Sequence, residues 1–132
     1  FSPKNVLVGD SDLWVIDFEV AHYGDPAFDL AFLLSHLLLK AVHRPVDAVL
    51  FGECAMTFGE AYRGCVPPPL RPEWPYVLGH TGCLLLARVA GKSPAEYLDP
   101  AGRSVAHELG RRLLVDPPST IERAYDRLAG MR

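Results

Sequence analysis

The chain has 132 residues, which is the length of one domain or of a part of one. Hydrophobic residues make up 49% of it and charged residues 22%, as is usual for globular proteins that fold in water. The formal net charge of −3 argues against nucleic-acid binding, which requires a clustered basic surface.

Two short strands are predicted at the start of the chain. Residues 4–9 and 13–18 are rich in β-branched and aromatic side chains, and the sequence GDSD between them is typical of a turn. We expect the two segments to pair as a β-hairpin.

A long apolar helix is predicted next. Asp25 followed by Pro26 is a typical helix start, because the carboxylate caps free amide groups and proline suits the first helical position. The apolar pattern runs to about residue 43, and Pro45 ends it. A helix that is apolar around most of its circumference is expected at the centre of the domain. It is not expected to span a membrane, because polar residues interrupt it: Asp29, Ser35, His36 and Lys40.

Four further helices are predicted, over residues 46–62, 74–90, 100–115 and from Ser119 onward, where Glu122 completes a capping box. The proline-rich segment RGCVPPPLRPEWP separates the first two of them, because successive prolines fix an extended path. The expected fold class is α+β and predominantly α-helical. It forms a single domain, with a hairpin and loop over 1–23 and a helical body over 24–132.

The three cysteines, Cys54, Cys65 and Cys83, do not have the spacing of a metal site. An odd number of cysteines favours free thiols over a disulfide framework, and free cysteines are usually small core residues. We therefore expect buried thiols in a reducing compartment, the cytoplasm.

Asn5 lies just before the first predicted strand and Asp17 at the end of the second. A hairpin brings these positions to the same end, so their oxygens form a candidate site for a hard cation such as Mg²⁺. The alternative is that both residues only form turns or caps, which is common for Asn and Asp at strand ends.

Three motifs in order carry a resemblance to a known family. FSPKNVLV, VIDFE and GDPAFDLA occupy residues 1–8, 15–19 and 24–31. Together the chain resembles the aminoglycoside phosphotransferase and choline kinase group of small-molecule kinases, which share the protein-kinase-like fold. The first motif resembles the segment after the Asp in the catalytic loop H-G-D-x-x-x-x-N, and the second resembles the magnesium motif D-F-G.

The resemblance implies roles for several residues. Asn5 and Asp17 would hold the Mg²⁺ that bridges the phosphates of ATP, and Asp29 would brace the catalytic loop. The alternative for Asp29 is a solvated acid near a helix N-terminus. Residues near the phosphates by this resemblance are Ser2, Lys4 and Glu19. Lys4 alternatively is an exposed turn lysine, and Glu19 a strand-end carboxylate.

Residues that contact the substrate are harder to identify. Glu53 and Glu60 share one face of the second predicted helix, where a cationic substrate would find acids, but paired glutamates usually form a solvated face. Trp74 and Tyr76 would stack on a substrate or, alternatively, pack in the core.

The resemblance implies that the chain is the C-terminal lobe of an ATP-dependent kinase, beginning just after the catalytic Asp. The kinase would phosphorylate a hydroxyl of a small molecule such as an aminoglycoside, choline or a sugar. The chain contains no G-x-G-x-x-G phosphate loop and no suitable lysine. We therefore expect the isolated chain to be inactive. The alternative is a truncated, non-catalytic helical domain that binds a partner through the surface the N-terminal lobe would cover.

Overall fold

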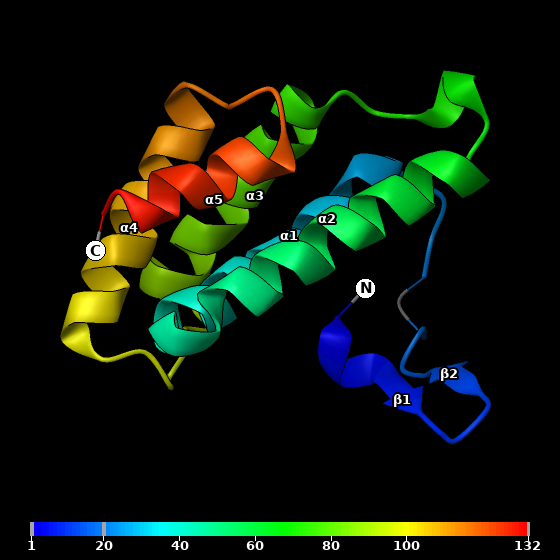
Figure 1. The fold of residues 1–132 in the computed structure, drawn as a ribbon, viewed down its shortest axis with the longest axis horizontal. Helices are drawn as coiled ribbons and strands as arrows, with labels where there is room; N and C mark the ends of the chain where they lie inside the picture. The colour runs from blue at the N-terminus through cyan, green and yellow to red at the C-terminus, as the bar shows by residue number, and fades with distance from the viewer. Residues whose placement is uncertain (1, 20, 132) are drawn as a thin grey trace.

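The computed structural model describes residues 2–19 and 21–131 as a small hairpin beside a body of five α-helices (Figure 1). The strands are β1 (Val6–Val8) and β2 (Leu13–Val15). The helices are α1 (Pro26–His43), α2 (Ala48–Cys65), α3 (Trp74–Ala90), α4 (Pro100–Val115) and α5 (Ile121–Ala129). Short 3₁₀ turns lie at Pro3–Asn5, Pro45–Asp47 and Pro68–Leu70. The predominantly helical α+β class is confirmed.

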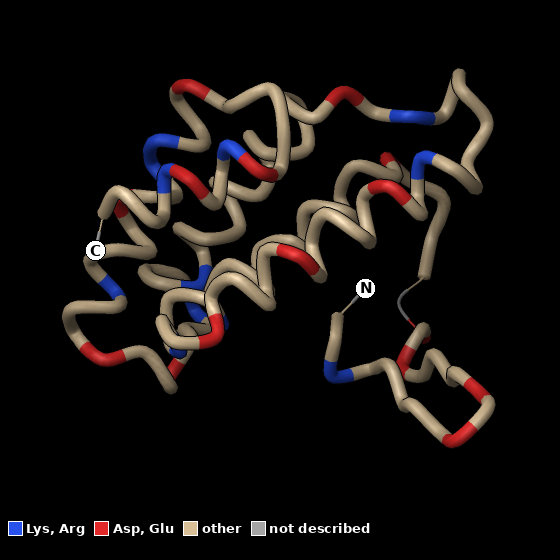
Figure 2. Tube along the Cα trace, in the orientation of Figure 1, with Lys and Arg blue, Asp and Glu red and all other residues tan. Residues whose placement is uncertain are grey.

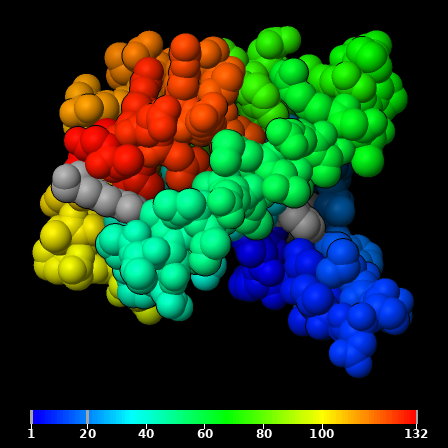
Figure 3. Space-filling view, in the orientation of Figure 1, coloured from blue at the N-terminus to red at the C-terminus, as the bar shows by residue number. Residues whose placement is uncertain are grey.

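The predicted hairpin is present, with antiparallel strands in the register Val6↔Val15 and Val8↔Leu13. It projects from the helical body, as the space-filling view shows (Figure 3). Both strands are shorter than expected from the apolar runs, because the two segments pair only from Val6↔Val15 to Val8↔Leu13. Large apolar side chains remain exposed on the hairpin and the loop after it: Leu7, Val8, Leu13, Trp14, Ile16 and Phe18.

Helix α1 is the centre of the body. Its start is as predicted: Asp25 Oδ1 accepts a hydrogen bond from the Ala27 backbone N–H at 2.9 Å, and Pro26 occupies the first position. Helices α2, α3 and α4 pack around it, and leucines fill the contacts. By length and apolar composition α1 would pass as a membrane span, but 61% of its residues are buried inside the body, which is the behaviour of a core helix.

Helices α3 and α4 cross closely, and glycines permit it. A Cβ atom on Gly82 would lie 2.6 Å from the Gly110 carbonyl oxygen and 2.7 Å from the Leu114 backbone nitrogen. The two backbones can approach this closely only because position 82 has no side chain. Leu85, Leu109 and Leu113 are buried beside the crossing.

Two predicted helix starts differ from the structure. Helix α2 begins at Ala48, because Pro45–Asp47 form a 3₁₀ turn before it. Helix α5 is capped by Thr120 instead of Ser119: the Thr120 hydroxyl accepts the Arg123 N–H at 3.2 Å. Both hydroxyl residues suit a cap. With Thr120 as the cap, Ile121 is buried, so packing favours this register.

The prediction that the cysteines are buried is wrong. Cys54, Cys65 and Cys83 are free, as expected, but all three are exposed. The buried positions of α2 are Gly52, Ala55 and Gly59, and those of α3 are Val77, Leu78, Thr81, Gly82 and Leu85. The cysteines therefore lie off the stripes that face the core, and the general preference of cysteine for interiors does not decide their place.

Tyr125 joins α5 to α2, and its phenol is expected to make stability depend on alkaline pH. Its hydroxyl donates to the Phe51 carbonyl oxygen at 3.1 Å. Burial first, and the neighbouring Cys54 second, raise the pKa of Tyr125 above its usual 10.0. Because the raised pKa favours the protonated phenol in the folded state, this contribution is complete below pH 10 and is lost as the pH rises through the folded value.

We therefore expect the melting temperature of the chain to fall more steeply above about pH 10 than that of Tyr125→Phe. At neutral pH the variant should lose about 1 kcal/mol of unfolding free energy, because the hydrogen bond from the Tyr125 hydroxyl to the Phe51 carbonyl is lost. Thermal melts followed by circular dichroism from pH 7 to about 11 measure both effects. Parallel pH curves for the two proteins would contradict the role of this phenol.

Candidate functional site

Asn5 and Asp17 meet at the open end of the hairpin, as the predicted strand pairing required. The Ile16 N–H donates to the Asn5 carbonyl oxygen at 2.9 Å and so extends the pairing beyond β1 and β2. The Asn5 side-chain amide then donates to Asp17 Oδ2 at 3.0 Å. Asn5 is held from the other side by the 3₁₀ turn, in which its backbone N–H donates to the Ser2 carbonyl oxygen at 3.0 Å.

The backbone of Asp17 is left-handed, with φ at 61°. Among the described residues, Asp17 is the one non-glycine residue with a positive φ. This conformation costs about 1–2 kcal/mol for most L-residues, although Asp tolerates it better than most. Residues held in such regions cluster at functional sites. The left-handed turn redirects the chain directly after β2, at the residue whose carboxylate reaches Asn5.

The Asn5–Asp17 pair suits a hard cation whose remaining ligands are water molecules or phosphates. The described residues contain no group of three or more His, Cys, Asp or Glu side chains able to hold a metal. One amide oxygen and one exposed carboxylate cannot enclose an ion alone. They do fit Mg²⁺, which keeps several waters and commonly binds one or two carboxylates together with the phosphates of a nucleotide.

The other predicted phosphate-side residues lie within three positions of Asn5 or Asp17 in the sequence. Lys4 and Glu19 are exposed, whereas Ser2 is buried, with 6% of its surface accessible. The hydroxyl of Ser2 has no hydrogen-bond partner among the described residues. Figure 2 shows that the hairpin and the loop after it carry mainly acidic charges, with one basic residue near the N-terminus.

Asp29 lies in the first turn of α1, where the positive end of the helix favours a carboxylate. It is exposed among the described residues. The resemblance implies that the Asp29 carboxylate accepts N–H bonds from the backbone of the catalytic loop, and this bracing role stays a prediction.

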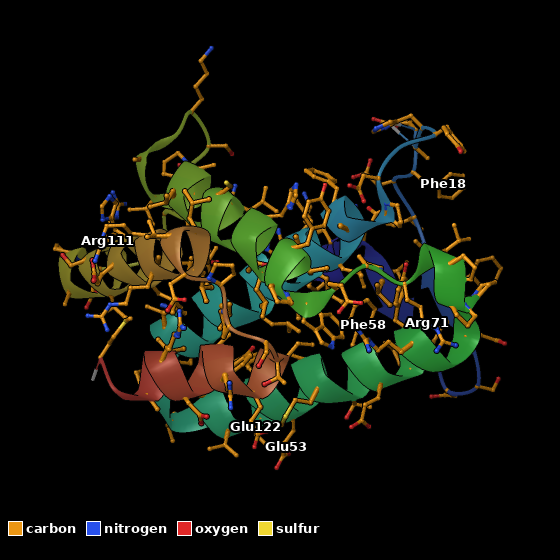
Figure 4. The ribbon with its side chains drawn as sticks, turned by 90° about the horizontal axis from the view of Figure 1, so that it is seen from above. Phe18, Glu53, Phe58, Arg71, Arg111 and Glu122 are labelled. Carbon is orange, nitrogen blue, oxygen red and sulfur yellow. The ribbon has the colours of Figure 1, made fainter. Side chains whose placement is uncertain are left out.

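The predicted substrate residues lie on the outer side of α2. Glu53 and Glu60 are both exposed. Figure 4 shows Glu53 on α2, far from Phe18, which is the residue after Asp17. Glu60 borders a hollow of about 190 Å³ together with Arg63, Trp74 and Glu122. The structure thus brings neither glutamate to the Asn5–Asp17 end of the hairpin.

A contact that the sequence did not indicate ties the start of α1 to α3. The Tyr76 hydroxyl donates to Asp25 Oδ2 at 2.7 Å. The sequence left stacking on a substrate or packing in the core open for Tyr76. It does not lie in the core, since 51% of its surface is exposed. No local pattern indicates the contact, because 51 residues separate the partners.

Trp74 has the same two alternatives as Tyr76. It is half-buried, with the Arg63 guanidinium 5.1 Å from the centre of its ring. A cation over the face of an indole is attracted by the negative charge of the ring. Trp74, the first residue of α3, therefore packs against α2. Of its two predicted roles, packing is the one that the structure supports.

Comparisons with known proteins agree with the motifs. The profile of the family described as "Phosphotransferase enzyme family" matches residues 1–68, just over half of the chain. The methylthioribose kinase of Geobacillus thermodenitrificans (strain NG80-2) is 29% identical over 140 residues, which cover 85% of this chain and 35% of the kinase. The chain thus spans about a third of the length of this curated relative. No solved structure matches it. The chain belongs to the phosphotransferase enzyme family, among small-molecule kinases of the aminoglycoside phosphotransferase type.

Proposed function

We propose that the chain is the C-terminal part of an ATP-dependent kinase that transfers the γ-phosphoryl group to a hydroxyl of a small molecule. The observation that carries the proposal is the Asn5–Asp17 pair, in a chain of the phosphotransferase family. The Asn5 side-chain amide lies 3.0 Å from Asp17 Oδ2, and the backbone of Asp17 is left-handed. Phosphoryl transfer depends mainly on positioning and on neutralising phosphate charge. A hard cation bound at the Asn5–Asp17 pair would neutralise this phosphate charge.

Asn5 and Asp17 would hold the magnesium ion through Asn5 Oδ1 and the Asp17 carboxylate. When bound, the ion neutralises charge on the phosphates of ATP and bridges them. Cation binding would replace the hydrogen bond between the two side chains. Lys4, which precedes Asn5 in the chain, is exposed and would approach a phosphate, and Ser2 and Glu19 are the other residues that we propose near the phosphates. Asp29 would brace the catalytic loop from the start of α1.

The acceptor in this proposal is a small molecule that carries a hydroxyl group. The relative is named a methylthioribose kinase, so methylthioribose is the first substrate to test. Aminoglycosides and choline come next, since the sequence resemblance implies them. Glu53 and Glu60 are not assigned to acceptor binding, because they lie away from the hairpin.

The rest of the machinery would come from parts of the whole protein outside this chain. A kinase of this kind also requires a catalytic Asp, a glycine-rich phosphate loop and a lysine that contacts the phosphates. The apolar side chains exposed on the hairpin fit a surface that such parts cover. We therefore propose that the isolated chain is inactive. The whole protein would act in the cytoplasm, without a nucleic-acid or membrane partner.

The test is an assay of the whole protein with ATP labelled in the γ-phosphate, Mg²⁺, and methylthioribose, choline or an aminoglycoside as acceptor. We expect label to appear on a sugar or amino alcohol and to depend on Mg²⁺. No transfer to any acceptor, together with no nucleotide binding, would overturn the proposal. That result would favour the non-catalytic interaction domain, which uses the same exposed apolar surface to bind another protein.

A further inference from the structure

The loop between β2 and α1 carries Asp17 at its start and Asp25 at its end. Residues 16–19 and 21–25 are exposed, so little burial holds them in place. Asp25 uses both carboxylate oxygens: Oδ1 accepts the Ala27 N–H at 2.9 Å, and Oδ2 accepts the Tyr76 hydroxyl at 2.7 Å. One carboxylate therefore ends the loop, starts α1 and joins both to α3.

Tyr76 is itself held in a defined orientation. The ring of His80 stands edge-on to it, with 4.4 Å between the ring centres. His80 Nδ1 lies 2.9 Å from the Tyr76 carbonyl oxygen, so the imidazole is fixed one turn along α3. The hydrogen bond from Tyr76, then that from the Ala27 backbone, lower the pKa of Asp25, so the acceptor is an ionised carboxylate. Hydrogen bonds to charged groups are the stronger ones.

The loop that begins with the left-handed Asp17 is held at each of its two ends. A residue in a sparsely populated conformation persists only when its surroundings hold it there. The upstream end is held by β2 and by the Ile16–Asn5 backbone bond. The downstream end is held at Asp25, through the cap of α1 and through Tyr76.

We propose that Tyr76 is a positioning residue for the metal ligand Asp17: by holding Asp25, it fixes the loop and raises the affinity of the Asn5–Asp17 pair for a divalent cation. This inference rests on the proposed function, because it assigns the cation to that pair. Tyr76 acts from α3 through the Asp25 carboxylate. The effect is therefore on metal affinity more than on the chemical step.

The experiment measures Mn²⁺ binding to the whole protein in the presence of ADP, by the loss of the free Mn²⁺ signal in electron paramagnetic resonance. We expect Tyr76→Phe to weaken Mn²⁺ binding by about three- to tenfold. In the kinase assay it should raise the KM for Mg²⁺ and leave kcat at saturating Mg²⁺ close to the wild-type value. Tyr97→Phe is the matched control, which removes a hydroxyl from another exposed tyrosine and should change neither quantity.

Two variants of Asp25 separate positioning from folding. Asp25→Ser keeps a residue that caps helices but cannot reach Tyr76, so it should weaken Mn²⁺ binding as much as Tyr76→Phe does. Asp25→Asn keeps an oxygen for the Ala27 N–H and an amide that can donate to the Tyr76 oxygen, and it should restore most of the affinity. If Tyr76→Phe or Asp25→Ser folded and bound Mn²⁺ with wild-type affinity, this inference would be overturned and the proposed function would stand. A wild-type protein that binds no Mn²⁺ with ADP would overturn it together with the proposed function.

Discussion

Asp17→Ala in the whole protein should lower kcat/KM for phosphoryl transfer by about 10³-fold, the largest effect expected on activity. The substitution removes the carboxylate of the proposed magnesium site and leaves Asn5 as its remaining side-chain ligand. The fold should persist, because Asp17 is exposed and contributes nothing to the core. Steady-state kinetics across a range of Mg²⁺ concentrations, with a thermal melt of the same preparation, measure the two effects.

Asp10→Ala is the matched control for this prediction. Asp10 is an exposed carboxylate in the turn of the same hairpin, at the end away from Asn5. The variant loses the same charge from the same hairpin, so kcat/KM should stay within about twofold of the wild type. Near-normal turnover of Asp17→Ala, or an equal loss in Asp10→Ala, would contradict the assignment of magnesium to Asn5 and Asp17.

Gly82→Ala should give the largest loss of stability, about 2–3 kcal/mol of unfolding free energy. The new methyl group would meet backbone atoms of α4 at 2.6 and 2.7 Å, so α3 and α4 would have to move apart. Backbone atoms cannot relieve the clash by a change of rotamer, as a flexible side chain can. The leucines at the crossing would therefore lose contacts when the helices separate. Urea unfolding followed by circular dichroism measures the change in midpoint.

Gly79→Ala, one turn earlier in α3, is the control for helix propensity. A Cβ at position 79 meets nothing within 4 Å. Alanine is favoured over glycine in a helix by about 1 kcal/mol, so this variant should be slightly more stable than the wild type. If both variants shifted the midpoint in the same direction, the close crossing of α3 and α4 would not be the cause.

Local sequence signals predicted most of the helical body. The bounds of α1, α3 and α4 agree with the expected ranges because each helix starts with a proline in its first turn. Asp25 caps α1 as predicted, and Asp99 caps α4 in the same way although its cap was not predicted. The Asn5–Asp17 contact was equally predictable, since a hairpin with a short turn fixes which residues meet at its open end.

The features that the sequence did not reveal depend on packing between distant segments. The choice of Thr120 over Ser119 as the cap of α5 results from burial of Ile121, which only the assembled body defines. The exposure of the cysteines likewise results from which stripe of α2 and α3 faces the core. The Tyr76–Asp25 hydrogen bond joins residues 51 positions apart, and an exposed aromatic residue gives no sign of its partner.

The most direct test of the central claim is a crystal structure of the whole protein with ADP and Mn²⁺, using the anomalous signal of manganese to locate the ion. We predict an anomalous peak bound by Asn5 Oδ1 and the Asp17 carboxylate, with the nucleotide phosphates completing its coordination. A nucleotide-bound structure with the manganese held by other residues, and the Asn5–Asp17 hydrogen bond intact, would contradict the account.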